Sequence, residues 1–176
     1  MKPEMSEAAL LDLLQQFERS GIEVWLDGGW AVDAVVGERT RAHRDLDLIL
    51  RASDLDRLCA VIGPRGFTRQ VGGTESNFVL ANGQGLEVDI HTVVFDAQGN
   101  GVHRMENGGD WVFRSSAFEG RGMIGSIPVR CLSPETQVEC HAQGYTPSEK
   151  DFRDMQLLAA RCGVELPPSL RRPQRT

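Results

Sequence analysis

The sequence predicts a mixed α/β (α+β) fold, in which a mixed β-sheet is flanked by helices. Segments with apolar residues at helical spacing alternate with short apolar runs that are typical of buried strands. Two of these runs, 77–81 and 86–94, are separated by Asn82-Gly83, a strong signal for a hairpin turn. The 176 residues are enough for one domain with a substantial core.

The first part of the chain is expected to alternate between helices and strands. The expected elements are a helix from Ser6 to Gly21, a strand over 22–26, a short helix over 30–36, an apolar strand over 45–50 and a helix over 53–62. The first and last of these helices begin at serines, which favour the N-cap position, and end at glycines, which favour a helix C-terminus.

The second part is expected to complete the sheet and to end in helices. The expected elements are strands over 77–81, 86–94 and 127–132, and helices that begin at Ser133 and Ser148. The stretch from Asp96 to Gly109 is rich in glycine and asparagine, which predicts a long flexible loop of the kind that forms lids or binding loops. We therefore divide the chain into a main domain over 1–132, a helical segment over 133–165 and a disordered tail over 166–176.

Two carboxylates lie within one apolar strand. Asp45 and Asp47 alternate with Leu46 and Leu48, so they leave the strand on the same side, about 6–7 Å apart along it. Because unpaired charge in an apolar environment is costly, such a pair needs a positive partner. Magnesium, which prefers oxygen ligands and is held by one or two carboxylates together with phosphates, is the natural candidate.

A second strand carries Glu87, Asp89 and His91 on one face. If the two strands are neighbours, Asp89 meets Asp45 and Asp47, and three carboxylates suit two metal ions roughly 3.5–4 Å apart. Glu87 is a further carboxylate near this site. His91 either orients Asp89 or contacts substrate, or it is a structural histidine bonded to a backbone carbonyl.

A glycine pair lies between the strand over 22–26 and the following helix. Gly28 and Gly29 would let the backbone approach a phosphate closely, and the helix N-terminus beyond them favours an anion. Arg44 is a second phosphate-binding candidate, or else it pairs with Glu38 or Asp33. Lys150 at the start of a late helix either reaches the triphosphate or is simply solvated.

Four aromatic residues are candidates for acceptor binding. Trp111, Phe113 and Phe118 follow the glycine-rich stretch and either form stacking surfaces or belong to the core. Tyr145 lies in the link between the two C-terminal helices and is a candidate for lining a substrate cleft.

Composition limits the partners. The net charge of -6 and the pI near 5.2 argue against nucleic acid and favour a cationic small molecule. The four cysteines have no metal-binding spacing and are expected to be reduced thiols. Neither a leader-like N-terminus nor a membrane-spanning apolar run is present in the sequence, which predicts a cytoplasmic protein without a membrane partner.

Four motifs, at residues 25–33, 41–47, 88–91 and 141–145, together resemble the small lincosamide nucleotidyltransferases. The resemblance extends, less closely, to the aminoglycoside 2''-nucleotidyltransferases and runs from about residue 8 to about residue 158. It implies a polymerase-beta-like nucleotidyltransferase fold with residues 1–132 as the catalytic domain. The wider superfamily commonly has Gly-Ser where this chain has Gly29-Trp30, a feature that the antibiotic-modifying branch shares.

The resemblance also implies roles. Asp45 and Asp47 would bind metal, Gly28 and Gly29 would touch the triphosphate, and Asp89 would be a metal ligand, the general base, or both. The implied reaction is magnesium-dependent transfer of a nucleoside monophosphate, AMP from ATP or another NTP, to a hydroxyl of a lincosamide-like antibiotic, with release of pyrophosphate. Relatives of this type suggest a homodimer.

Other functions remain open on the sequence alone. An aminoglycoside acceptor would keep the chemistry and change only the pocket. A nucleotidyltransferase that modifies a protein is a further alternative, while the acidic composition argues against modification of an RNA end. A nucleotide-binding protein without catalysis is the last alternative, and the retention of Asp45, Asp47 and Asp89 together argues against it.

Overall fold

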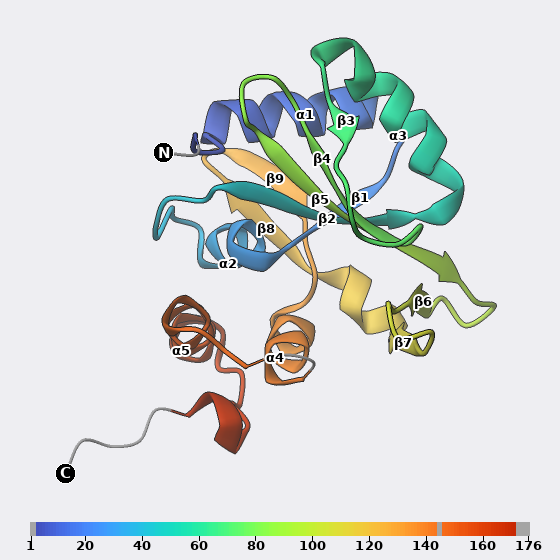
Figure 1. Ribbon diagram of the computed structural model, residues 1–176. Coiled ribbons are helices and arrows are strands. Elements are labelled where there is room, and N and C mark those ends of the chain that lie inside the picture. Colours follow the sequence, from blue (N-terminus) through green and yellow to red (C-terminus); the bar gives the residue numbers. More distant parts are fainter. Residues whose placement is uncertain (1–2, 144–145, 172–176) are drawn as a thin grey trace.

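The computed structural model describes residues 3–143 and 146–171, in which helices and strands are interleaved (Figure 1). The helices are α1 (Glu7–Arg19), α2 (Gly28–Val36), α3 (Leu55–Ile62), α4 (Pro134–Ala142) and α5 (Glu149–Cys162), with 3-10 turns η1 (Ala52–Asp54), η2 (Gly63–Arg65), η3 (Ser115–Glu119) and η4 (Pro168–Leu170). The strands are β1 (Val24–Asp27), β2 (Asp45–Arg51), β3 (Thr68–Arg69), β4 (Asn77–Ala81), β5 (Glu87–Phe95), β6 (Gly101–Arg104), β7 (Asp110–Phe113), β8 (Arg121–Ile124) and β9 (Ile127–Arg130).

A mixed sheet with the strand order β1-β2-β5-β4-β3 forms the centre of the molecule. Strands β2 and β5 pair in parallel, whereas β2 pairs with β1, and β5 with β4, in antiparallel fashion. The expected mixed sheet and the hairpin at Asn82-Gly83 are therefore confirmed. Since β2 and β5 are neighbours, the residues at the start of β2 lie beside those at the start of β5.

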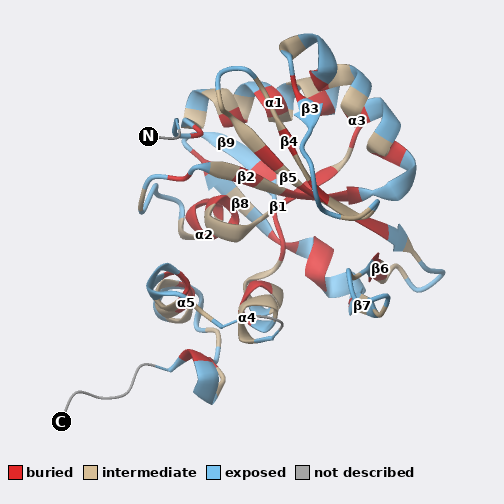
Figure 2. Cartoon of the chain, in the orientation of Figure 1, coloured by how far each residue is buried: buried red, intermediate tan, exposed pale blue. Residues whose placement is uncertain are grey.

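One face of this sheet is packed against α1 and α3, which lie together on that side in Figure 1. Leu46 and Leu48 of β2 and Val88 and Ile90 of β5 point into this layer and are fully buried. Figure 2 shows the buried residues concentrated between the sheet and these helices. Each buried leucine or isoleucine contributes about 1.5–3 kcal/mol, so the strands that carry the acidic residues are anchored from behind.

The other face is shared between a second apolar cluster and the polar residues of β2 and β5. Ile49 and Trp25 pack there against Phe113 and Phe118. Because side chains alternate along a strand, Asp45 and Asp47 lie on the same face as Ile49. The carboxylates therefore lie at the end of this face, beyond its apolar part.

The C-terminal helices pack on α2, on the side of the sheet opposite α1 and α3 (Figure 1). Val32 of α2 joins Val138 of α4 and Met155 and Leu158 of α5 in one buried cluster. Leu170 completes it. The cluster holds the beginning of α5 close to the glycine pair at the beginning of α2.

The expected flexible loop over 96–109 is wrong in part. Residues 101–104 form β6, which pairs with β5 and with β7. The glycine at position 101 reflects close packing and not flexibility, because a Cβ there would lie 2.6 Å from a ring carbon of Phe118. Glycine content alone does not distinguish these two reasons for a missing side chain.

Two further boundaries differ from the expectation. Helix α2 begins at Gly28, so the glycine pair is its first turn and not a separate turn before a helix at Trp30. The disordered tail expected from residue 166 does not begin there, because Leu166 and Leu170 are buried and η4 is formed; residues 172–176 lie outside the described part of the chain. Among the described helices, none is both long and apolar enough to cross a membrane.

Candidate functional site

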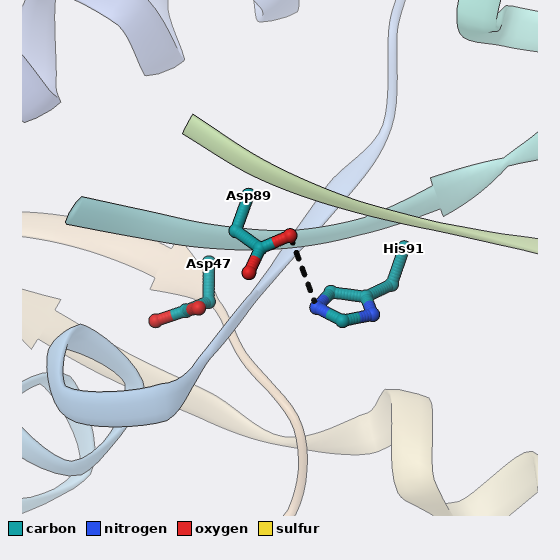
Figure 3. A group of neighbouring side chains, drawn as sticks. All are labelled: Asp47, Asp89 and His91. Atoms are coloured by element: carbon teal, nitrogen blue, oxygen red, sulfur yellow. Dashed lines mark ion pairs between the residues drawn. The ribbon is translucent and has the colours of Figure 1, made fainter. Parts of the chain in front are cut away.

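The acidic residues of three neighbouring strands are aligned by the register of the sheet. Asp27 of β1 is paired with Asp47 of β2, which is paired in turn with Asp89 of β5. Ligand atoms of Asp47, Asp89 and His91 all lie within 4.8 Å of one another, and Figure 3 shows these three side chains on the same side of the sheet. Asp45 lies two residues before Asp47, at the beginning of β2, and is not a member of this close group.

The electrostatics of this group call for a cation. Burial raises the pKa of Asp47 well above its ordinary value, and the charges of Asp45, Asp27 and Asp89 raise it further. Burial also raises the pKa of Asp89, although the charge of His91 works in the opposite direction. The buried Oδ1 of Asp89 has no hydrogen-bond partner among the described residues. Carboxylate oxygens that repel one another, one of them without a hydrogen-bond partner, fit a divalent cation.

The glycine pair is required by the packing of charged side chains against it. A Cβ at Gly28 would lie 2.3 Å from Oδ2 of Asp47, and Gly28 also has a φ of +59°, which favours glycine. A Cβ at Gly29 would lie 2.3 Å from Nη2 of Arg41. Asp27 accepts a hydrogen bond from the backbone N–H of Gly28 at 2.8 Å, which fixes the entry into α2.

The segment between α2 and β2 is held by a buried histidine. Nε2 of His43 lies 2.5 Å from Oδ2 of Asp33, and its ring packs against Trp30 with the centroids 4.5 Å apart. Asp33 also accepts hydrogen bonds from the backbone and side chain of Thr40. His43 therefore has a structural role, and it fixes the segment that carries Arg41.

Arg41 bridges this segment to α5. Its Nη2 lies 2.8 Å from Oδ2 of Asp154, and its Nε is 3.3 Å from both carboxylate oxygens. The Asp154 side chain is 7% exposed and that of Arg41 is 29% exposed, so the pair is mostly shielded from solvent. The interaction joins residues 113 positions apart and sets the position of α5 over the acidic strands.

A cavity of about 220 Å³ lies between the acidic strands, the glycine pair and α5, and neither Asp89 nor His91 lines it. Its lining residues are Asp27, Gly28, Gly29, Arg41, Asp45, Asp47, Cys140, His141, Lys150, Asp151 and Asp154. Lys150 lies in the first turn of α5, next to the capping box that Ser148 forms with Asp151. Its charge lowers the pKa of Asp47, although burial and the neighbouring carboxylates outweigh this effect.

The structure brings together most, but not all, of the residues that the sequence indicated. Glu87 is paired in register with Asp45 but does not line the cavity. Arg44 is exposed and lies outside the cavity. The two carboxylates considered as its ion-pair partners have other partners, since Asp33 is bonded to His43 and Thr40, and Glu38 to Arg161.

The aromatic candidates lie elsewhere. Trp111 and Phe113 line a separate cavity of about 570 Å³ between η3 and α4, and Phe113 and Phe118 are buried in the second apolar cluster. Tyr145 lies outside the described residues. Of the two alternatives, the core is therefore the correct one for Phe113 and Phe118, whereas Trp111 does not reach the cavity of the carboxylates.

Several lining residues were not predicted from the sequence to belong to the site, among them Arg41, Asp27 and His141. Asp27 had a detectable signal, since an aspartate directly before a glycine pair at a strand end is a natural N-cap. The ion pair of Arg41 had no local signal, because its partner Asp154 lies 113 positions away on α5.

The family described as Aminoglycoside-2''-adenylyltransferase matches residues 9–158. The lincosamide resistance protein of Staphylococcus haemolyticus is 30% identical over 155 residues, which span 88% of this chain and 94% of that protein. The 2''-aminoglycoside nucleotidyltransferase of Escherichia coli is 31% identical over 70 residues, which span 34% of this chain and 40% of that protein.

Two solved structures are similar in fold. The lincosamide antibiotic adenylyltransferase LnuA, in its lincomycin-bound form, superposes with a TM-score of 0.79 at 28% identity, and the match covers 90% of this chain and 99% of the other. ANT(2'')-Ia in complex with adenylyl-2''-tobramycin superposes with a TM-score of 0.70 at 21% identity and covers 89% of both chains. The expected nucleotidyltransferase fold is therefore confirmed.

Proposed function

The chain belongs to the aminoglycoside-2''-adenylyltransferase family, and we propose that it transfers AMP from ATP to a hydroxyl of a lincosamide-like antibiotic, with release of pyrophosphate. The observation that carries this proposal is the row of carboxylates on β1, β2 and β5, on a chain whose similarity to a lincosamide resistance protein extends over nearly all of both sequences. The family makes the protein an antibiotic-modifying nucleotidyltransferase; the lincosamide acceptor and the nucleotide belong to the proposal.

The proposed metal ligands are Asp45, Asp47 and Asp89. When bound, two magnesium ions would neutralise these carboxylates and stabilise the charge that develops on the transferred phosphoryl group. The unpartnered Oδ1 of Asp89 and the raised pKa of Asp47 support this assignment. Asp89 is also the proposed general base for the acceptor hydroxyl, because it lies beside Asp47 in the row of carboxylates.

Arg41 and Lys150 are the proposed triphosphate-binding residues. Both line the cavity of Asp45 and Asp47, and each carries a positive charge into an otherwise acidic site. Gly28 and Gly29 would contribute backbone N–H groups from the first turn of α2, where an anion is favoured. Arg44, which is exposed and outside the cavity, becomes a weaker candidate.

The test is pyrophosphate release from each of the four nucleoside triphosphates with magnesium, in the presence of lincomycin, clindamycin or a panel of aminoglycosides that includes tobramycin. Asp45→Asn removes one proposed ligand, and Asp56→Asn on the exposed side of α3 is the matched control. We expect turnover of ATP on lincosamides, lost in Asp45→Asn and kept in Asp56→Asn.

Other results would redirect the proposal. Turnover only on aminoglycosides would keep the chemistry and change the acceptor; the acidic lining of the cavity favours this second candidate, since aminoglycosides are strongly cationic. Nucleotide binding without turnover on any compound would exclude the antibiotic acceptor and direct the search to a protein target. Equal activity of Asp45→Asn and Asp56→Asn would overturn the site assignment.

Two broader features complete the proposal. A cavity of about 220 Å³ is small for a nucleotide and an antibiotic together, which supports completion of the cleft by a second copy of the chain. A monomer by light scattering at assay concentration would exclude this.

The need for ATP supports action in the cytoplasm, and the net charge of -6 argues against a nucleic acid partner.

A further inference from the structure

His91 shares the acidic site with two of the proposed metal ligands. It lies two positions after Asp89 on β5, on the same face, and its Nε2 faces Oδ1 of Asp89 at 3.6 Å (Figure 3). The closest group of ligand atoms that the described residues form around this site is Asp47, Asp89 and His91, and not the three aspartates.

The distance from His91 to Asp89 is too long for a good hydrogen bond. Two ligand atoms that are each about 2.1 Å from one ion are separated by roughly 3.0–3.4 Å, depending on the coordination angle. A small rotation of either side chain would therefore bring Nε2 and Oδ1 onto a common ion. The same Oδ1 has no hydrogen-bond partner among the described residues, so an ion would take a contact that the protein leaves unfilled.

The orientation of His91 is supported from behind. Its ring meets that of His103 edge to face, with the centroids 5.7 Å apart. His103 is buried and its Nδ1 lies 2.9 Å from the carbonyl oxygen of Thr92, which fixes that ring in the sheet. This arrangement holds the imidazole on the acidic face, with 25% of its side chain exposed.

We propose that His91 supplies a nitrogen ligand, together with Asp47 and Asp89, to one divalent ion of the site, and that this position favours a transition-metal ion such as Mn²⁺ over Mg²⁺. Imidazole nitrogen suits transition metals, whereas Mg²⁺ prefers oxygen ligands and keeps much of its water. The inference rests on the proposed function only in taking a divalent ion to be part of the reaction.

The test is direct detection of the nitrogen ligand. Purified protein is loaded with Mn²⁺, and electron spin-echo modulation from ¹⁴N is measured for the parent chain, His91→Gln and His141→Gln. His141 lines the adjoining cavity of Asp45 and Asp47, which His91 does not line, so its variant is the control for a second histidine near the site. We expect ¹⁴N modulation in the parent and in His141→Gln, and its loss in His91→Gln.

Equilibrium binding of the two metals gives a second readout that a merely structural histidine would not produce. We expect His91→Gln to weaken Mn²⁺ binding by about tenfold or more and to change Mg²⁺ binding much less. Equal weakening of both metals, or ¹⁴N modulation that survives in His91→Gln, would overturn the inference.

The outcome is separable from that of the proposed function. An enzyme that adenylylates a lincosamide but shows no ¹⁴N modulation would refute the nitrogen ligand and leave the function standing. Modulation in a protein that modifies none of the compounds would have the opposite meaning. Failure of the parent chain to bind Mn²⁺ at all would also refute the inference.

Discussion

At the scale of single residues, the site depends on the absence of side chains at Gly28. The space that a Cβ would occupy there is filled by the carboxylate of Asp47, and the positive φ adds a second reason for glycine. The sequence predicts that a phosphate approaches the backbone at this glycine. The structure adds a second requirement, since the acidic strand also packs against it.

We therefore expect Gly28→Ala to displace the Asp47 carboxylate. The left-handed backbone should cost about 1–2 kcal/mol of unfolding free energy. A displaced ligand should also lower nucleotidyl transfer by about 100-fold, because a shift of about 1 Å has that effect on positioned groups. The measurements are urea unfolding and kcat/KM.

Gly37→Ala is the matched control. Gly37 also has a positive φ, of +81°, but a Cβ there would meet no atom within 4 Å. It should show the same backbone cost and keep its activity. Similar activities for the two alanine variants would mean that the contact between Gly28 and Asp47 is not functionally important.

At the scale of elements, β1, β2 and β5 place like charges in one row. Parallel pairing of β2 with β5 and antiparallel pairing of β2 with β1 align Asp27, Asp47 and Asp89 across the sheet. Such a row opposes folding unless a cation binds, because each carboxylate disfavours ionisation of its neighbours. The stability of these strands should therefore depend on metal and on pH.

Asp47→Asn should stabilise the metal-free protein by about 1–2 kcal/mol at neutral pH while abolishing activity. Burial and the neighbouring carboxylates raise the pKa of Asp47 above its ordinary value of 3.8. The destabilisation that ionised Asp47 causes in the parent chain is thus absent below that ordinary value. It grows as the pH rises and is complete above the raised pKa. The gain from Asp47→Asn should disappear in acid.

Urea unfolding in EDTA and in excess Mg²⁺ checks this prediction. A bound ion at 100 times its dissociation constant adds about 2.7 kcal/mol to the parent chain, and the variant should gain less. A variant that is less stable than the parent in EDTA at neutral pH would show that Asp47 is held by favourable contacts and not by a cation.

The elements differ in how far their sequence predicted them. The strands β2 and β5 were predictable because apolar and acidic residues alternate in their first halves. The hairpin at Asn82-Gly83 was predictable because this dipeptide favours a tight turn. The pairing of β6 and β7 was not, since Gly101 serves a contact with Phe118 that only the folded chain reveals. The same limit applies to Arg41, whose partner Asp154 is distant in sequence.

At the scale of the whole molecule, two separately anchored parts meet at the site. The acidic strands are anchored by the core under α1 and α3, whereas α5, with Lys150 and Asp154, is held by the cluster that Val32 and Leu170 share. The metal ligands therefore belong to one part and a proposed phosphate-binding lysine to the other. This division should allow metal binding and nucleotide binding to be separated by mutation.

Leu170→Ala should make that separation. Leu170 is fully buried in the cluster of α5, and its truncation should cost about 2–5 kcal/mol. Loosening α5 should raise the KM for ATP, because Lys150 and the Arg41–Asp154 pair are no longer fixed, while Mn²⁺ affinity stays unchanged. Leu58→Ala on α3, which is equally buried but packs on the opposite side of the sheet, is the matched control. It should lose similar stability without a selective rise in KM, and an equal rise in both variants would mean that the two parts do not act separately.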